Sequence, residues 1–153
     1  MAILKNTEEL KNELGSLIWR MATNLVHGGK VSPVQFMDYT LGALFYRFIS
    51  ENITDYCNKL MADAGVPNPD YANMSDKTAE NAREQIINAK GFYILPSQLF
   101  INVANGASKN TELNTTLANN FKAIEQSAIG KPSENDVKGL FSNFNTNDDG
   151  LGA

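Results

Sequence analysis

Oxygen-bearing side chains alternate near the C-terminal end of the sequence, in the segment Asn145-Thr146-Asn147-Asp148-Asp149-Gly150. Alternating oxygen ligands followed by a glycine at a sharp turn are typical of the first half of a calcium-binding loop. However, Asn145 stands where such loops carry aspartate, Gly152 stands where they carry an apolar residue, and the position of the bidentate glutamate falls beyond Ala153. Because Asn, Asp and Gly are also common turn residues, we interpret the segment as a turn and predict no metal site.

A second candidate, Asn68-Pro69-Asp70-Tyr71, is close to the Asn-Pro-Pro-aromatic motif with which amino-methyltransferases hold a target amine. Aspartate replaces the second proline, and the segment follows a helix stop at Ala64-Gly65 instead of an apolar strand. A flipped base needs a rigid pocket at the end of a sheet strand. We therefore interpret this segment as a turn without a catalytic role.

The remaining reactive side chains give no support for catalysis. His27 is the only histidine, which excludes a multi-histidine metal site, and it lies where a helix is expected to end. There it can interact with the helix dipole. Cys57 is on an amphipathic segment and is interpreted as a buried structural thiol. Since no glycine-rich nucleotide-binding motif occurs either, we assign no catalytic, cofactor-binding or metal-binding residue.

Three basic residues are candidates for contact with DNA or a protein partner. Arg47 interrupts the apolar run 41–49, and Glu51 lies one helical turn further on. An Arg47–Glu51 ion pair is one interpretation, and a phosphate or partner contact is the other. Arg20 and Lys30 flank the expected end of the first helix and are the best further candidates.

The spacing of apolar residues predicts an all-α fold. A first helix is expected over about 7–27, from an Asn6 capping box to a glycine stop. The Ser32-Pro33-Val34-Gln35 motif predicts a second helix that continues to Ala64-Gly65, about 48 Å in length. Shorter helices are predicted over 75–90, 97–105, 111–128 and 133–141, with an irregular or β-like connector near 92–96.

The second helix is expected to be the central element of a helical bundle, because its middle is apolar almost all round. The expected core at the crossing of the first two helices is Trp19 with Leu44, Phe45 and Phe48. We expect residues 1–142 to form an N-terminal helical domain. Residues 143–153 are expected to be a turn-rich tail or linker.

Composition restricts the class of protein further. A length of 153 residues with 42% hydrophobic and 20% charged residues suits one globular domain. The net charge of −4 and the pI of about 5.0 argue against a free-standing nucleic-acid binder. A single cysteine, the lack of a signal-like N-terminal segment and the short apolar runs predict a cytoplasmic protein outside the membrane.

Three ordered segments resemble a known family. Residues 14–19 with His27-Gly28 look like the opening helix of type I restriction-modification DNA methyltransferase subunits. Residues 41–50, LGALFYRFIS, are close to the second-helix signature of that family, and residues 138–152 are similar to the segment that closes its helical domain. The resemblance covers nearly the whole chain, although His27 stands where arginine is common in the family.

The resemblance implies a parent enzyme that transfers a methyl group from S-adenosylmethionine to an adenine amino group of DNA. It also implies a complex with a specificity subunit, a motor-nuclease restriction subunit and a second methyltransferase subunit. The N-terminal domain would aid assembly of these subunits and closure around double-stranded DNA, without holding the cofactor. The resemblance further implies that the linker 143–153 leads toward a catalytic domain that this sequence does not contain. The alternative is a self-contained helical adaptor that binds only other proteins.

Overall fold

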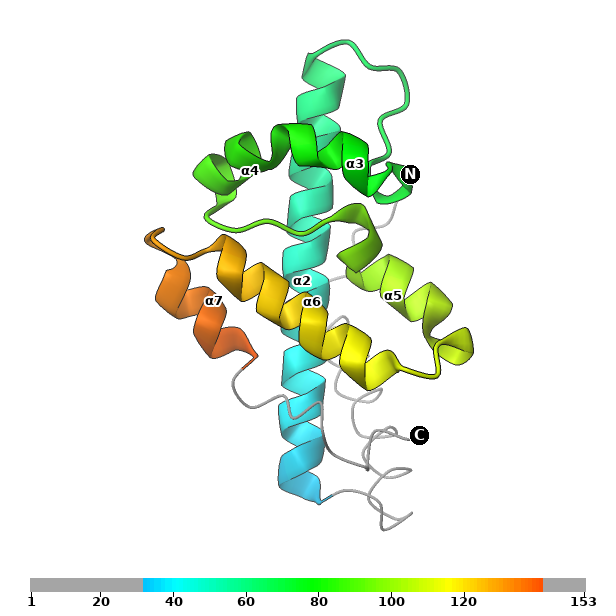
Figure 1. Ribbon diagram of the computed structural model, residues 1–153, viewed down its shortest axis with the longest axis vertical. Coiled ribbons are helices and arrows are strands. Elements are labelled where there is room, and N and C mark those ends of the chain that lie inside the picture. Colours follow the sequence, from blue (N-terminus) through cyan, green and yellow to red (C-terminus); the bar gives the residue numbers. More distant parts are fainter. Residues whose placement is uncertain (1–31, 142–153) are drawn as a thin grey trace, which may run out of the picture. The chain divides into compact units, whose positions relative to one another are not determined.

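Residues 32–141 are described by the computed structural model, in which the chain divides into two compact units, Met1–Leu41 and Gly42–Ala153. The predicted first helix, Trp19, and the predicted tail 143–153 with its domain boundary lie outside the described residues. The described part contains helices and short 3₁₀ turns but no strand, which confirms the all-α prediction (Figure 1). Its helices are α2 (Pro33–Asp63), α3 (Asp76–Ala79), α4 (Arg83–Lys90), α5 (Phe100–Gly106), α6 (Leu113–Ser127) and α7 (Glu134–Leu140).

The long helix α2 begins and ends where the sequence predicts. The Ser32 amide donates to Gln35 Oε1 at 2.9 Å, and the Gln35 amide donates to Ser32 Oγ at 3.2 Å. This reciprocal pair is the predicted capping box, which satisfies two amides that the first helical turn leaves without partners. At the other end Gly65 adopts a φ of +82°, and the Val66 amide donates to the Met61 carbonyl at 2.9 Å. The left-handed glycine therefore ends the helix, as expected.

One face of α2 forms the centre of the hydrophobic core in the second unit. Tyr46, Ile49, Ile53 and Cys57 recur at helical spacing and are all buried. Figure 1 shows α6 crossing the middle of α2, and the segment from α3 to α4 crossing it nearer its C-terminal end. The buried side chains that these and neighbouring elements contribute to the same cluster include Ile86, Ile94, Leu99, Phe121, Ile124, Val137 and Phe141.

The other face of α2 is more open than its composition suggests. Leu44 is half-buried, whereas Phe45 is 41% exposed and Phe48 is 64% exposed. In the part of the chain that the structure describes, α2 is therefore not enclosed on all sides. The predicted packing of Leu44, Phe45 and Phe48 against Trp19 stays a prediction, because Trp19 lies outside the described residues.

The helix predicted over 75–90 is interrupted. Ser75 caps α3 by accepting the Thr78 amide, but a 3₁₀ turn at Glu80–Ala82 separates α3 from α4. Arg83 begins α4, where its guanidinium donates to Glu80 and lies 5.0 Å from the centre of the Tyr93 ring. No proline or glycine marks the interruption in the sequence, so apolar spacing alone could not reveal it.

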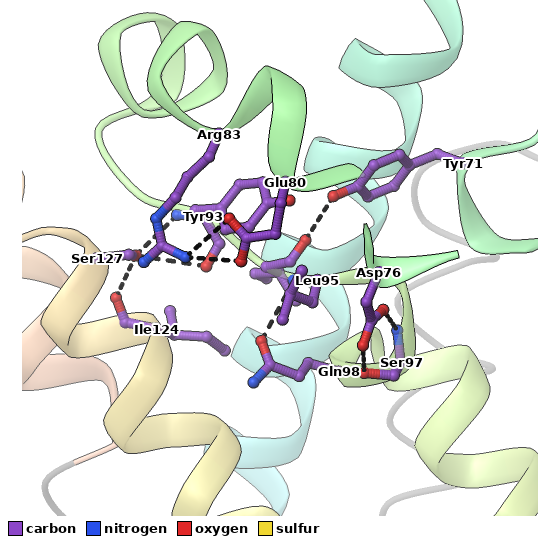
Figure 2. Close-up of polar contacts among 11 residues, drawn as sticks. Tyr71, Asp76, Glu80, Arg83, Tyr93, Leu95, Ser97, Gln98, Ile124 and Ser127 are labelled. Carbon is purple, nitrogen blue, oxygen red and sulfur yellow. Dashed lines mark hydrogen bonds and ion pairs between the residues drawn. The ribbon is translucent and has the colours of Figure 1, made fainter. Parts of the chain in front are cut away.

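The connector predicted near 92–96 is extended and has no neighbouring strand among the described residues. Side chains satisfy its backbone instead, as Figure 2 shows. The Tyr93 amide donates to Ser127 Oγ at 2.8 Å, and Tyr71 Oη donates to the Ile94 carbonyl at 2.8 Å. The Leu95 amide donates to Gln98 Oε1 at 3.2 Å. The bonds from Tyr71 and Ser127, both distant in sequence, and the local bond from Gln98 explain why a β-prone segment remains irregular inside a helical fold.

Candidate functional site

The predicted contact residue Arg47 lines a surface pocket of about 360 Å³ between α2 and the start of α5. Ser50, Glu51, Thr54 and Asp55 follow it along α2, and the opposite side is made by Leu99, Phe100 and Ile101. The two sides are joined where the Phe100 amide donates to Ser50 Oγ at 3.1 Å. The sequence separates these sides by about fifty residues, so only the fold brings them together.

The charged side chains that line this pocket are Arg47, Glu51 and Asp55, so acidic groups outnumber basic ones. Arg47 Nε donates to Glu51 Oε1 at 2.7 Å, which is the predicted ion pair, and both side chains are 61% exposed. An exposed pair of this spacing contributes only about 0.3–0.5 kcal/mol to stability. Asp55 adds a second carboxylate, so the pocket lining carries two acidic side chains and one basic side chain. The other two candidates, Arg20 and Lys30, lie outside the described residues.

The Asn68-Pro69-Asp70-Tyr71 segment is a turn, as predicted. Asn68 has a φ of +48°, and the Asp70 carboxylate accepts the Asn73 amide at 3.2 Å. Tyr71 is 2% exposed, and its amide donates to Asn58 Oδ1 at 2.8 Å. The aromatic ring that would hold a substrate in a catalytic motif is therefore part of the core.

A second pocket, of about 220 Å³, is lined by Cys57 and Tyr71 together with residues of α3 and α4. Burial raises the pKa of the Cys57 thiol to about 11, which makes it a poor nucleophile at neutral pH. Burial also raises the pKa of Tyr71 and of the neighbouring Tyr93. These groups are neutral packing elements, which agrees with the interpretation of Cys57 as a structural thiol.

The buried thiol predicts how stability depends on alkaline pH. The pKa of Cys57 is about 11 in the folded chain against an ordinary 9.0, and burial raises that of Tyr46 from 10.0 to about 12. The folded state therefore keeps protons that the unfolded state loses, so stability is full below about pH 9 and falls as pH rises further. Urea unfolding midpoints measured across this range should decline from about pH 9 upward.

The control for this prediction is Cys57→Ala. Removing the thiol should move the start of the decline to about pH 10, where tyrosines of the unfolded chain begin to ionise. Above about pH 9 only the natural chain loses the stability that its protonated thiol contributes, so its free energy of unfolding should approach that of the variant. If the plots of unfolding midpoint against pH are parallel for the two proteins, the thiol has the same pKa in the folded and unfolded chains. That result would contradict the burial of Cys57.

Residues 32–141 contain no cluster of three or more His, Cys, Asp or Glu side chains that could hold a metal ion. Among the same residues no helix is long and apolar enough to cross a membrane. The core residues that the sequence did not reveal include the aromatic side chains Tyr71, Tyr93 and Phe141. Their only signal was aromatic character, since their partners are distant in sequence.

Comparison with known proteins gives the chain its family. Residues 14–152 match the family described as the HsdM N-terminal domain. The type I restriction enzyme MpnII methylase subunit of Mycoplasma pneumoniae is 37% identical over 158 residues, which cover 97% of this chain and 28% of that protein. No solved structure shows a significant match. The matches do not favour a self-contained adaptor, and the chain belongs to the HsdM N-terminal domain family.

Proposed function

We propose that this chain is the N-terminal domain of an adenine-specific DNA methyltransferase subunit of a type I restriction-modification system. Its role would be to aid subunit assembly and closure around double-stranded DNA in the cytoplasm. The proposed partners are a specificity subunit, a motor-nuclease subunit and a second methyltransferase subunit. The observation that carries the proposal is the family match over residues 14–152, joined by a relative named as a methylase subunit.

The proposed methyl donor, S-adenosylmethionine, does not fit the described residues. Cofactors of this kind are held by a glycine-rich turn that follows a sheet strand, and residues 32–141 contain no strand. We therefore assign cofactor binding and methyl transfer to parts of the complete subunit outside this domain. The chain spans 28% of the length of its Mycoplasma pneumoniae relative, which leaves ample length for them.

The surface of the described residues supports a role in protein contacts. The Arg47 pocket has an exposed apolar side chain in its lining, since Ile101 on α5 is 51% exposed. Phe48, the neighbour of Arg47 along α2, is 64% exposed. Exposed apolar groups rimmed by charges are typical of protein interaction surfaces. The pocket therefore suits a subunit contact better than a DNA backbone.

The contribution of this domain to DNA binding can be tested by removing basic side chains in the complete enzyme. Phosphate contacts release counterions, so removing one of them should reduce the salt dependence of binding. With Arg20→Ala and Lys30→Ala combined, we expect weaker affinity for every DNA site and a salt slope lower by about one unit for each phosphate interaction removed. The measurement is equilibrium binding of the assembled enzyme to specific and unrelated duplexes over a range of salt.

The matched control removes two exposed lysines elsewhere, Lys77→Ala with Lys109→Ala. This variant changes the net charge equally but should leave the salt slope unchanged. Equal slopes for all three enzymes would assign the domain to subunit packing alone. A loss confined to one DNA sequence would contradict the proposed sequence-independent contribution.

A further inference from the structure

A third pocket, of about 150 Å³, lies on the surface where α2, α5 and α6 meet. No polar atom of its described lining is exposed to it. Tyr46, Phe100 and Phe121 line it with their rings, and the rest of the lining is aliphatic: Ala43, Val103, Ala104, Ala107, Leu113 and Leu117. An engineered apolar cavity of about this volume binds benzene, so a phenyl ring is a suitable occupant.

The chain itself carries a phenyl ring within reach of this α2–α5–α6 pocket. Phe141, the last described residue, is 5% exposed and stacks on Phe121 with ring centres 4.1 Å apart. Phe121 is also part of the pocket lining. Phe144 follows three residues later, so its Cα lies at most about 11 Å from that of Phe141. It is the only aromatic residue among residues 142–153.

We propose that the α2–α5–α6 pocket binds the side chain of Phe144 and so anchors the segment after Phe141 against the helical domain. The phenyl ring would contact Phe121 from the pocket while Phe141 stacks on it, since aromatic rings gain energy from such stacked or edge contacts. The short Ser142-Asn143 spacer suits this arrangement, because it allows the two phenylalanines to contact one wall residue.

The first test compares melting temperatures of single variants of the 153-residue chain. Phe144→Ala should lower the melting temperature by about 5 °C or more, as expected for loss of a buried ring. Phe144→Leu should keep most of the stability, because it still fills the pocket. The matched control is Leu151→Ala, an apolar truncation in the same segment, which should change the melting temperature by no more than about 1 °C.

The second test asks whether Phe144 and the pocket are coupled. Ala104→Leu adds volume to the α5 side of the pocket. In the natural chain the added side chain should compete with Phe144 and lower the melting temperature. In the Phe144→Ala chain it should fill the pocket and raise the melting temperature. This reversal of sign is the expected result.

Other occupants predict different outcomes. If Ala104→Leu has the same effect with and without Phe144, the ring does not occupy the pocket and the proposal is wrong. If instead the melting temperature rises with protein concentration and sedimentation shows a dimer that Ala104→Leu disrupts, the pocket binds a second copy of the chain. Both results would overturn the anchoring of residue 144.

Discussion

Replacing Tyr46 with alanine is expected to lower the free energy of unfolding by about 3–5 kcal/mol, the usual loss for a fully buried aromatic side chain. Tyr46 is 1% exposed, and its ring meets Phe100, Phe121 and Phe141 edge-on with centres 5.6, 5.3 and 6.4 Å away. One truncation therefore removes contacts to α5, α6 and the end of α7 at once. Equilibrium urea unfolding followed by circular dichroism measures the loss.

Two controls separate the ring from its hydroxyl and from its position on α2. Tyr46→Phe keeps the ring but leaves the Gln98 carbonyl, to which the hydroxyl donates, without this bond, which should cost about 1–3 kcal/mol. Phe48→Ala removes a ring of similar size two residues away that is 64% exposed, so it should cost less than about 1 kcal/mol. An equal loss at both positions would contradict the exposure of Phe48 and favour its predicted contact with Trp19.

The second large effect is expected at Gly91, where Gly91→Ala should cost about 2–5 kcal/mol. Gly91 ends α4 with a φ of +83°, a backbone conformation that strains an alanine. An added Cβ would overlap Ser133 Oγ and lie 2.8 Å from Ser133 Cβ. That contact belongs to the join between α4 and α7, since Ser133 Oγ donates to the Gly91 carbonyl at 2.7 Å.

Gly65 serves as a control that separates the cost of the left-handed backbone from the cost of the steric overlap with Ser133. Gly65 ends α2 with a φ of +82°, but no atom lies within 4 Å of its added Cβ. Gly65→Ala should therefore cost only about 1–2 kcal/mol. Combining Gly91→Ala with Ser133→Gly should recover the steric part of the loss. If both glycine substitutions cost the same, Ser133 does not stand against Gly91 as the structure places it.

Helix boundaries set by local chemistry were predictable from the sequence. The Ser32–Gln35 capping box, the glycine stop at Gly65 and the Arg47–Glu51 spacing all involve residues within one helical turn of each other. Gly91 likewise ends α4 where the sequence predicts a stop. Such features can be predicted from the sequence because the two interacting residues are close along the chain and meet whatever the rest of the fold is. The predicted family followed from ordered segments of the same local kind.

Tertiary structure decided which faces of these helices are buried. In α2 the apolar residues Phe45, Tyr46 and Phe48 lie within one turn, so hydrophobicity could not tell that Tyr46 is enclosed while Phe48 is open. The choice depends on where α5, α6 and α7 cross, and those contacts join residues far apart in sequence. The connector around Ile94 shows the same dependence, since hydrogen bonds from Tyr71 and Ser127 satisfy its backbone. A local sequence pattern indicates which secondary structure a segment prefers, whereas the burial of that segment is determined by the elements that pack on it.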